Sequence, residues 1–208
     1  MNFLIDYGAG NIKSVLNALN YLNINVIITS DAKELKKASR IILPGVGAYK
    51  NCIDSLKKIN LDQALMDLVI EKKIPYLGIC VGFQILSEFG LEFGKTEGLG
   101  FLSGETLDMK NDTSKRLPHM GWNKIDFSQD YNLTKNNLFN NIDTGSFFYF
   151  LHSFHFKVKN QEFITSTFEY ENKFVASIQK DNIYGVQFHP EKSQNNGLKI
   201  LENFFKKI

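Results

Sequence analysis

The sequence predicts an α/β fold in which a mostly parallel central sheet is flanked by helices and extended by a smaller mixed or antiparallel sheet. Two observations predict it. Up to Gly90, apolar runs of strand length alternate with segments of helical periodicity. Beyond Gly90, glycines cluster and short runs with β character follow one another.

The first half alternates strands with helices, as a parallel sheet covered on both faces requires. Apolar residues between 12 and 22 recur with helical spacing, and Ser30 or Asp31 can cap a short helix. Pro44 and Gly45 end one strand. We expect strands at 2–6, 25–29, 40–43 and 75–79, and helices at 12–22, 48–58, 61–72 and from 83 to 89.

The sequence pattern of the second half is typical of hairpins or a mixed sheet. We expect strands near Leu117 and at 124–127, 147–151, 163–170, 174–179 and 183–188, and a closing helix at 198–205. There is no internal repeat, low-complexity segment or linker. A single domain over residues 1–208 is therefore expected.

Composition excludes several classes of protein. Of 208 residues, 43% are hydrophobic and 22% charged, which is ordinary for a soluble globular protein. The formal net charge of +2 gives no reason to expect nucleic acid or an anionic membrane as a partner.

The cysteines and the apolar runs indicate the cellular compartment of the protein. Only Cys52 and Cys80 are present, so a disulfide framework is not expected and a reducing compartment is favoured. The N-terminus has no signal-peptide pattern, and no run approaches the roughly 18 apolar residues of a membrane span. We therefore expect a cytoplasmic protein.

The sharpest motif is Gly-Ile-Cys-Val-Gly at 78–82, directly between a predicted strand and a predicted helix. This is the nucleophile-elbow pattern with Cys80 as the nucleophile. The strand reverses sharply into the helix, so bulky side chains two residues either side of Cys80 would collide. The turn places the sulfur at a helix N-terminus, which favours the thiolate, and the N–H of Val81 can receive an oxyanion.

The alternative for Cys80 is a buried structural cysteine beside ordinary loop glycines. Glycine makes up only 15 of the 208 residues, so chance seldom places it on both sides of a cysteine. Cys52 lacks such flanking glycines and lies in a helical stretch, where a packed small hydrophobe is the better interpretation.

A cysteine nucleophile needs a base, and the base needs an orienting group. Only His189 of the four histidines lies in His-Pro-Glu, at the end of an apolar run. Pro190 stiffens the link, and Glu191 is near enough to hold the imidazole tautomer. A lone histidine is more often structural, but its pairing with the cysteine elbow favours the catalytic interpretation.

Pro-Gly-Val-Gly at 44–47 is a third, weaker motif, because most such sequences are plain turns. Its flexible glycines could present a backbone N–H to a developing oxyanion. It is too short for a dinucleotide fingerprint, and the chain has no phosphate-binding P-loop. No Cys/His cluster has zinc spacing, so neither a metal nor a cofactor is implied.

Together these residues resemble the class I, triad-type glutamine amidotransferases, whose fold is flavodoxin-like. Further motifs resemble the glutaminase subunits of imidazole glycerol phosphate synthase, and the resemblance covers nearly the whole chain. Val81 and Phe83 stand where that family usually has Leu and Met. The resemblance to the class I family rests on residues 78–84 and 188–191. The further motifs lie at 6–11, 44–48, 118–123, 149–153 and 191–194.

The resemblance implies a glutaminase that acts on L-glutamine with a Cys-His-Glu triad. Cys80 would attack the side-chain amide, His189 would move the protons, and Glu191 would orient His189. The oxyanion would be held by the N–H of Val81 and by one from the Val46–Gly47 peptide.

The resemblance also implies where the substrate and the partner bind. Gln84 and Glu92 match positions that bind the amino-acid end of glutamine, and backbone at Ser153 and Phe154 completes that pocket. Glu92 has the alternative of a solvated helix-end charge. Asn11, Met120, Trp122 and Lys192 match the face that meets the partner, and Trp122 has the alternative of filling a core pocket.

The implied partner is a (β/α)8-barrel synthase subunit, which would form a heterodimer with this chain and use its ammonia. The products would be imidazole glycerol phosphate and an aminoimidazole carboxamide ribotide, in histidine biosynthesis. The alternative client is a sugar amidotransferase of surface-polysaccharide synthesis. A non-catalytic regulatory module, or a chaperone or protease-like relative with histidine directly after the cysteine, fits the motifs less well.

Overall fold

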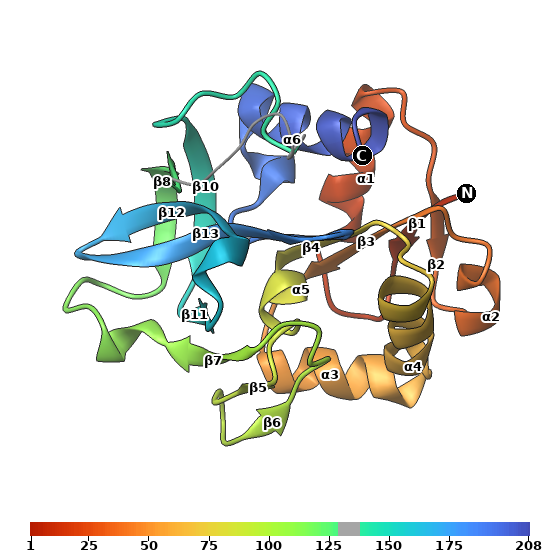
Figure 1. Cartoon of the computed structure of the whole chain (residues 1–208), viewed down its shortest axis with the longest axis horizontal. Helices are drawn as coiled ribbons and strands as arrows, with labels where there is room; N and C mark the ends of the chain where they lie inside the picture. The colour runs from red at the N-terminus through yellow and green to blue at the C-terminus, as the bar shows by residue number, and fades with distance from the viewer. Residues whose placement is uncertain (129–137) are drawn as a thin grey trace.

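A computed structural model describes residues 1–128 and 138–208 of the chain. Its centre is a mixed sheet (Figure 1), and the strand and helix alternation predicts the parallel part of it. Among the described strands of this sheet, the first five in sheet order run parallel to one another and the last three continue it antiparallel. In sheet order the strands are β2 (Ile27–Thr29), β1 (Asn2–Ile5), β3 (Arg40–Gly45), β4 (Tyr76–Cys80), β14 (Ile183–Val186), β13 (Asn172–Lys180), β12 (Ile164–Tyr170) and β9 (Asp126–Phe127).

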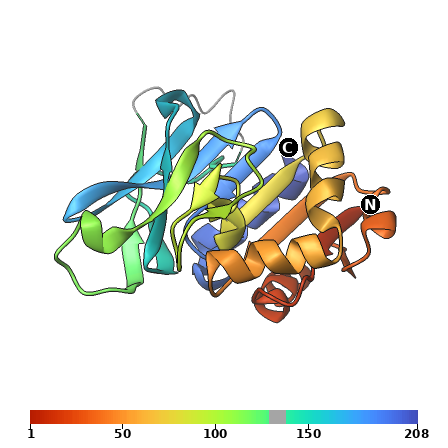
Figure 2. The same ribbon diagram turned by 90° about the horizontal axis from the view of Figure 1, so that it is seen from below.

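Helices cover both faces of the parallel strands. On one face lie α1 (Ile12–Tyr21) and α6 (Gln194–Lys206); on the other lie α3 (Tyr49–Lys58) and α4 (Leu61–Leu65), which a π-helix continues over Met66–Glu71 (Figures 1 and 2). Of the two candidate caps, Asp31 caps α2 (Ala32–Leu35), and its side chain accepts a hydrogen bond from the Lys33 N–H at 2.8 Å.

The extension beyond the central sheet is built from two small sheets. Antiparallel β8 (His119–Lys124) and β10 (Phe147–His152) form one. The other is mixed, in the order β11 (Phe154–Val158), β7 (Gly104–Asp108), β5 (Phe89–Gly90) and β6 (Thr96–Glu97). In the described residues, short 3-10 helices lie at Met109–Asn111, Gln161–Phe163 and Pro190–Lys192.

The helix expected from 83 to 89 is wrong in extent: α5 covers only Val81–Gln84. The carbonyl oxygens of residues 85–88 accept hydrogen bonds from N–H groups of residues 98–102. These contacts replace the bonds that a longer helix would need, so the chain turns into β5 instead.

Other predicted boundaries also shift. The strand expected near Leu117 begins at His119, the closing helix begins at Gln194, and the strand at 25–29 is confined to Ile27–Thr29. Strands β5, β6, β7 and β11 were not predicted. β5 and β6 have two residues each, too few for an alternating pattern, and β7 pairs with β11, which lies far away in the sequence.

Candidate active site

The predicted nucleophile lies at a sharp turn between β4 and α5. Cys80 is the last residue of β4 and adopts φ 54° and ψ −110°, a conformation that costs energy for a residue with a side chain. Its side chain is 3% exposed. The structure therefore gives Cys80 the strained elbow that its flanking glycines predict.

The glycines around Cys80 are required by close backbone packing. A Cβ atom on Gly82 would lie 2.0 Å from the carbonyl oxygen of Leu43, and one on Gly78 would lie 2.4 Å from that of Gly82. Gly45 is similarly constrained, since its Cβ would lie 2.6 Å from the Gly82 nitrogen. The elbow and the Pro44–Gly47 loop can thus pack together only with glycine at these positions.

The predicted base reaches Cys80 because β14 pairs in parallel with β4, which brings the carboxyl ends of both strands to one sheet edge. The backbone N–H of His189 donates to the Tyr149 carbonyl at 2.8 Å. Its Nδ1 donates to Oε1 of Glu191 at 2.9 Å, and the two side chains are 2% and 1% exposed. That bond leaves Nε2 as the nitrogen available for proton transfer.

The charge environment favours protonated His189. Burial lowers its pKa, but the charge of Cys80 and the contact with Glu191 outweigh burial and raise the pKa to about 10. In the described part of the chain, Nε2 of His189 has no partner in hydrogen-bonding geometry. This arrangement suits an imidazolium beside a thiolate.

A cavity of about 430 Å³ opens at the elbow. Every oxyanion and substrate-binding residue expected from the sequence contributes to its wall, together with Cys80 and His189. Glu191 is absent from the wall because it lies behind the imidazole. The expected residues on the wall are Val46, Gly47, Val81, Gln84, Glu92, Ser153 and Phe154, and the others are Ala48, Phe93, Pro118, Leu151 and His152.

Two of these polar side chains are held in place by backbone groups. Oε2 of Glu92 accepts a hydrogen bond from the N–H of Tyr49 at 2.7 Å, at the start of α3. Glu92 is therefore anchored at the cavity wall by one oxygen rather than freely solvated. The amide of Gln84 donates to the Phe154 carbonyl at 2.7 Å and to Oε1 of Gln187 at 3.1 Å.

Gln187 is a residue of this site that the sequence did not indicate. Its Nε2 lies 3.8 Å from the sulfur of Cys80, and its side chain is fully buried. It directly follows β14, whose last pair is Val186 with Ile79 of β4. The parallel register was the signal available: the residue after Val186 falls opposite the one after Ile79.

The remaining cysteine and histidines have structural settings. Cys52 is completely buried in α3, where burial raises its pKa to about 11. The burial of Cys52 confirms the prediction that it packs as a small hydrophobic residue. His152 bonds the Phe154 carbonyl through Nδ1 at 2.8 Å and faces Nδ1 of His119 at 3.3 Å.

Near the cavity lies an exposed apolar surface formed by β8 and β10. Met120 is 66% exposed and Trp122 is 46% exposed, so the alternative that Trp122 fills a core pocket is wrong. The Trp122 ring packs edge-on against Tyr149, with centroids 6.1 Å apart. Nζ of Lys192 lies 5.8 Å from the centroid of the Tyr149 ring. Asn11, at the start of α1, is partly exposed.

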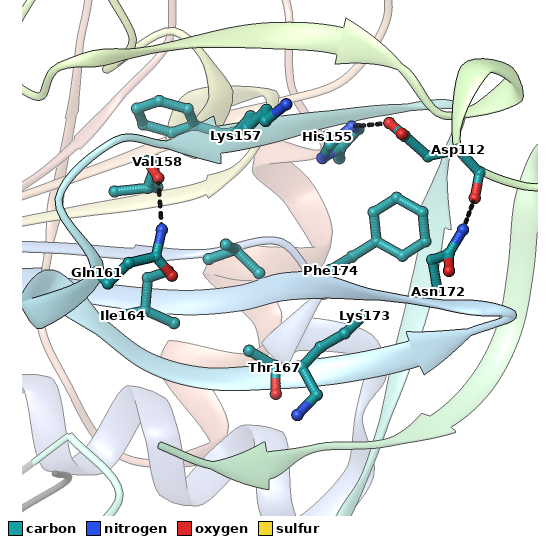
Figure 3. A pocket seen from close by; sticks show the side chains of 12 residues that line it. Asp112, His155, Lys157, Val158, Gln161, Ile164, Thr167, Asn172, Lys173 and Phe174 are labelled. Atoms are coloured by element: carbon teal, nitrogen blue, oxygen red, sulfur yellow. Dashed lines mark hydrogen bonds and ion pairs between the residues drawn. The ribbon is translucent and has the colours of Figure 1, made fainter. Parts of the chain in front are cut away.

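A second cavity, of about 260 Å³, lies beside β11, β12 and β13 (Figure 3). Its wall contains none of the predicted site residues. Nε2 of His155 is 3.2 Å from Oδ2 of Asp112, and Nε2 of Gln161 donates to the Val158 carbonyl at 3.1 Å. The lining contains neither cysteine nor serine, and His155 is paired with Asp112 rather than with a nucleophile.

Within residues 1–128 and 138–208, no three His, Cys, Asp or Glu side chains are grouped so as to hold a metal ion. Across the same residues, none of the helices has the length and apolar character needed to cross a membrane.

An elbow cysteine beside a buried His–Glu pair on a parallel sheet defines a class of enzyme, and sequence comparison gives the same class. Residues 3–208 match the family described as "Glutamine amidotransferase class-I". The chain belongs to this family.

The similar curated proteins narrow the match within the family. The chain is 46% identical to "Imidazole glycerol phosphate synthase subunit HisH 1" of Campylobacter jejuni, over 98% of both chains. It is 42% identical to "Imidazole glycerol phosphate synthase subunit HisH 2" of Methanococcus maripaludis, again over 98% of both.

Solved structures share the fold. One titled "Crystal structure of glutamine amidotransferase" superposes with a TM-score of 0.74 at 14% identity, covering 98% of both chains. "Structure of PurLQS from Thermotoga maritima" also has a TM-score of 0.74, at 17% identity, and covers 99% of this chain and 97% of that one. The predicted fold class is thereby confirmed.

Proposed function

We propose that this protein hydrolyses L-glutamine to glutamate and ammonia. The observation that carries the proposal is that Cys80 and His189 share the wall of one cavity, with Glu191 bonded to His189 behind it, in a chain of the class I glutamine amidotransferase family. A thiolate at a strained elbow, an imidazole and a buried carboxylate are the parts that acyl transfer from an amide requires.

The sulfur of Cys80 attacks the side-chain amide carbon of glutamine and forms a tetrahedral oxyanion. N–H groups of Val81 and of the Val46–Gly47 peptide stabilise that charge. His189 gives its proton to the departing nitrogen, the C–N bond breaks, and ammonia leaves a glutamyl thioester. A water molecule, deprotonated by His189, then cleaves the thioester and restores the thiolate.

The remaining cavity residues hold the amino-acid end of the substrate. Both amide protons of Gln84 are engaged by Phe154 and Gln187, so Gln84 offers its oxygen, an acceptor suited to an ammonium. The Glu92 carboxylate adds negative charge, with one oxygen already anchored by Tyr49. Backbone groups at Ser153 and Phe154 complete this end of the pocket.

The client of the ammonia is a (β/α)8-barrel synthase subunit. The names of the relatives favour imidazole glycerol phosphate synthase, in histidine biosynthesis, over a sugar amidotransferase of polysaccharide synthesis. Asn11, Met120, Trp122 and Lys192 form the contact face of a cytoplasmic heterodimer, and residues 1–208 act as one domain. No cofactor is required by this chemistry.

The test is Cys80→Ala. This variant loses glutamine hydrolysis, while the complex with the synthase subunit still makes product from added ammonia. Cys52→Ala, the matched control at the other cysteine, keeps glutamine hydrolysis. Near-normal hydrolysis by a folded Cys80→Ala protein would overturn the proposal.

A further inference from the structure

A chain of amide groups connects the backbone carbonyl of Phe154 to the sulfur of Cys80. Nε2 of Gln84 lies 2.7 Å from that carbonyl oxygen and 3.1 Å from Oε1 of Gln187. Nε2 of Gln187 in turn lies 3.8 Å from the Cys80 sulfur. The side chains of Gln84 and Gln187 are 3% and 0% exposed, so water does not compete for these bonds.

The orientation of both amides follows from the first link. A backbone carbonyl can only accept, so Gln84 must present its NH2 group to Phe154. The second proton of that NH2 group then faces Gln187, which must present its oxygen. As a result, the NH2 group of Gln187 faces the sulfur of Cys80. The opposite flip of Gln84 would place its oxygen against the Phe154 carbonyl oxygen, and the opposite flip of Gln187 would place its NH2 group against that of Gln84.

We propose that Gln187 is a fourth side chain of the glutaminase site, whose amide N–H stabilises the thiolate of Cys80 and is aimed at the sulfur by Gln84 and the Phe154 carbonyl. This inference rests on the proposed function, in which that thiolate is the nucleophile. A donor to the ionised sulfur favours the thiolate over the thiol.

The contribution of Gln187 to the thiolate differs from those of the other groups around the sulfur. The carbonyl of Leu151, 3.8 Å from the sulfur, accepts from the thiol and opposes ionisation. His189 supplies positive charge, but it must give up its proton during turnover. The Gln187 amide cannot be deprotonated, so it continues to stabilise the thiolate when His189 is neutral.

The experiment measures ionisation of the sulfur directly. Alkylation of Cys80 by iodoacetamide is followed as a function of pH in the full chain, with the labelled peptide resolved from that of Cys52 by mass spectrometry. Gln187→Met keeps the side-chain volume and removes the donor. We expect the apparent pKa of alkylation to rise by about one pH unit, and the rate below that pKa to fall about tenfold.

Two further variants sharpen the test. Gln187→Glu is isosteric, lacks the amide donor and as a carboxylate adds negative charge beside the sulfur, so it shifts the profile further in the same direction. It serves also if Gln187→Met does not fold. Gln179→Met is the matched control and should leave the alkylation profile unchanged. Gln179 lies outside the cavity, and its Nε2 donates to the Tyr184 hydroxyl at 3.2 Å.

Unchanged alkylation profiles in folded Gln187→Met or Gln187→Glu protein would overturn the inference. That outcome is separate from failure of the proposed function, because alkylation needs no glutamine turnover. If wild-type protein does not hydrolyse glutamine, the proposed function fails whatever the alkylation profile shows.

Discussion

Nδ1 of His189 donates a hydrogen bond to Oε1 of Glu191 at 2.9 Å in an almost fully buried pair. The two residues are joined by Pro190, so the chain itself holds the carboxylate beside the ring. This bond orients the imidazole and contributes to the raised pKa of His189.

Replacing Glu191 with Gln therefore weakens catalysis less than replacing His189. An amide keeps the volume of the orienting group, whereas His189→Ala removes the proton carrier. We expect kcat to fall roughly 10³- to 10⁴-fold in Glu191→Gln and at least tenfold further in His189→Ala. Steady-state kinetics of the complex measure both. Glu97→Gln, on exposed β6, is the control, and a larger loss in Glu191→Gln would contradict the assigned roles.

Gly82→Ala destabilises the fold by about 3 kcal/mol or more, or prevents folding, because its Cβ would overlap the Leu43 carbonyl. Gly94→Ala is the control: Gly94 has φ +98° and open space around it, so only the conformational cost of about 1 kcal/mol applies. Urea unfolding measures the difference. Equal stabilities would show that β3 and the elbow can separate without cost.

Trp122→Ala weakens binding of the synthase subunit and the glutaminase activity of the complex together, since exposed aromatic anchors carry much of an interface's free energy. We expect a loss of about 2 kcal/mol in affinity, measured by titration. Tyr21→Ala, on α1 and 75% exposed, removes an aromatic ring of similar size elsewhere and serves as the control. Unchanged affinity in folded Trp122→Ala protein would place the interface elsewhere.

Acid destabilises the protein through two buried histidines. Burial lowers the pKa of His119 to about 4 and that of His152 to about 3. In the unfolded chain a histidine has a pKa of about 6.5. Between that pH and the lowered pKa values of the folded protein, the unfolded state binds more protons than the folded state. The folded protein therefore keeps its full stability above pH 6.5 and loses stability as the pH falls below it.

Denaturant titrations from pH 7.5 to pH 4.5 measure this dependence. A variant with His119→Phe keeps an aromatic ring between Phe150 and Phe168, with which His119 stacks. It should have a flatter stability profile than the wild type. An equally steep profile would assign the acid sensitivity to other groups.

The sequence alone determined the alternating sheet and helices and the three predicted catalytic side chains. The reason is locality: Gly78, Cys80 and Gly82 form one turn, and His189 and Glu191 are separated by one proline. Backbone sterics and neighbouring side chains specify such features without the rest of the fold.

The tertiary structure alone decided what faces the sulfur and where α5 ends. Gln187 meets Cys80 only because β14 pairs with β4, and Glu92 is fixed by a backbone N–H at the start of α3. The chain leaves α5 at Gln84 because residues 98–102 satisfy the carbonyls of residues 85–88. Hydrogen bonds between distant segments settle these features, and no local pattern encodes them.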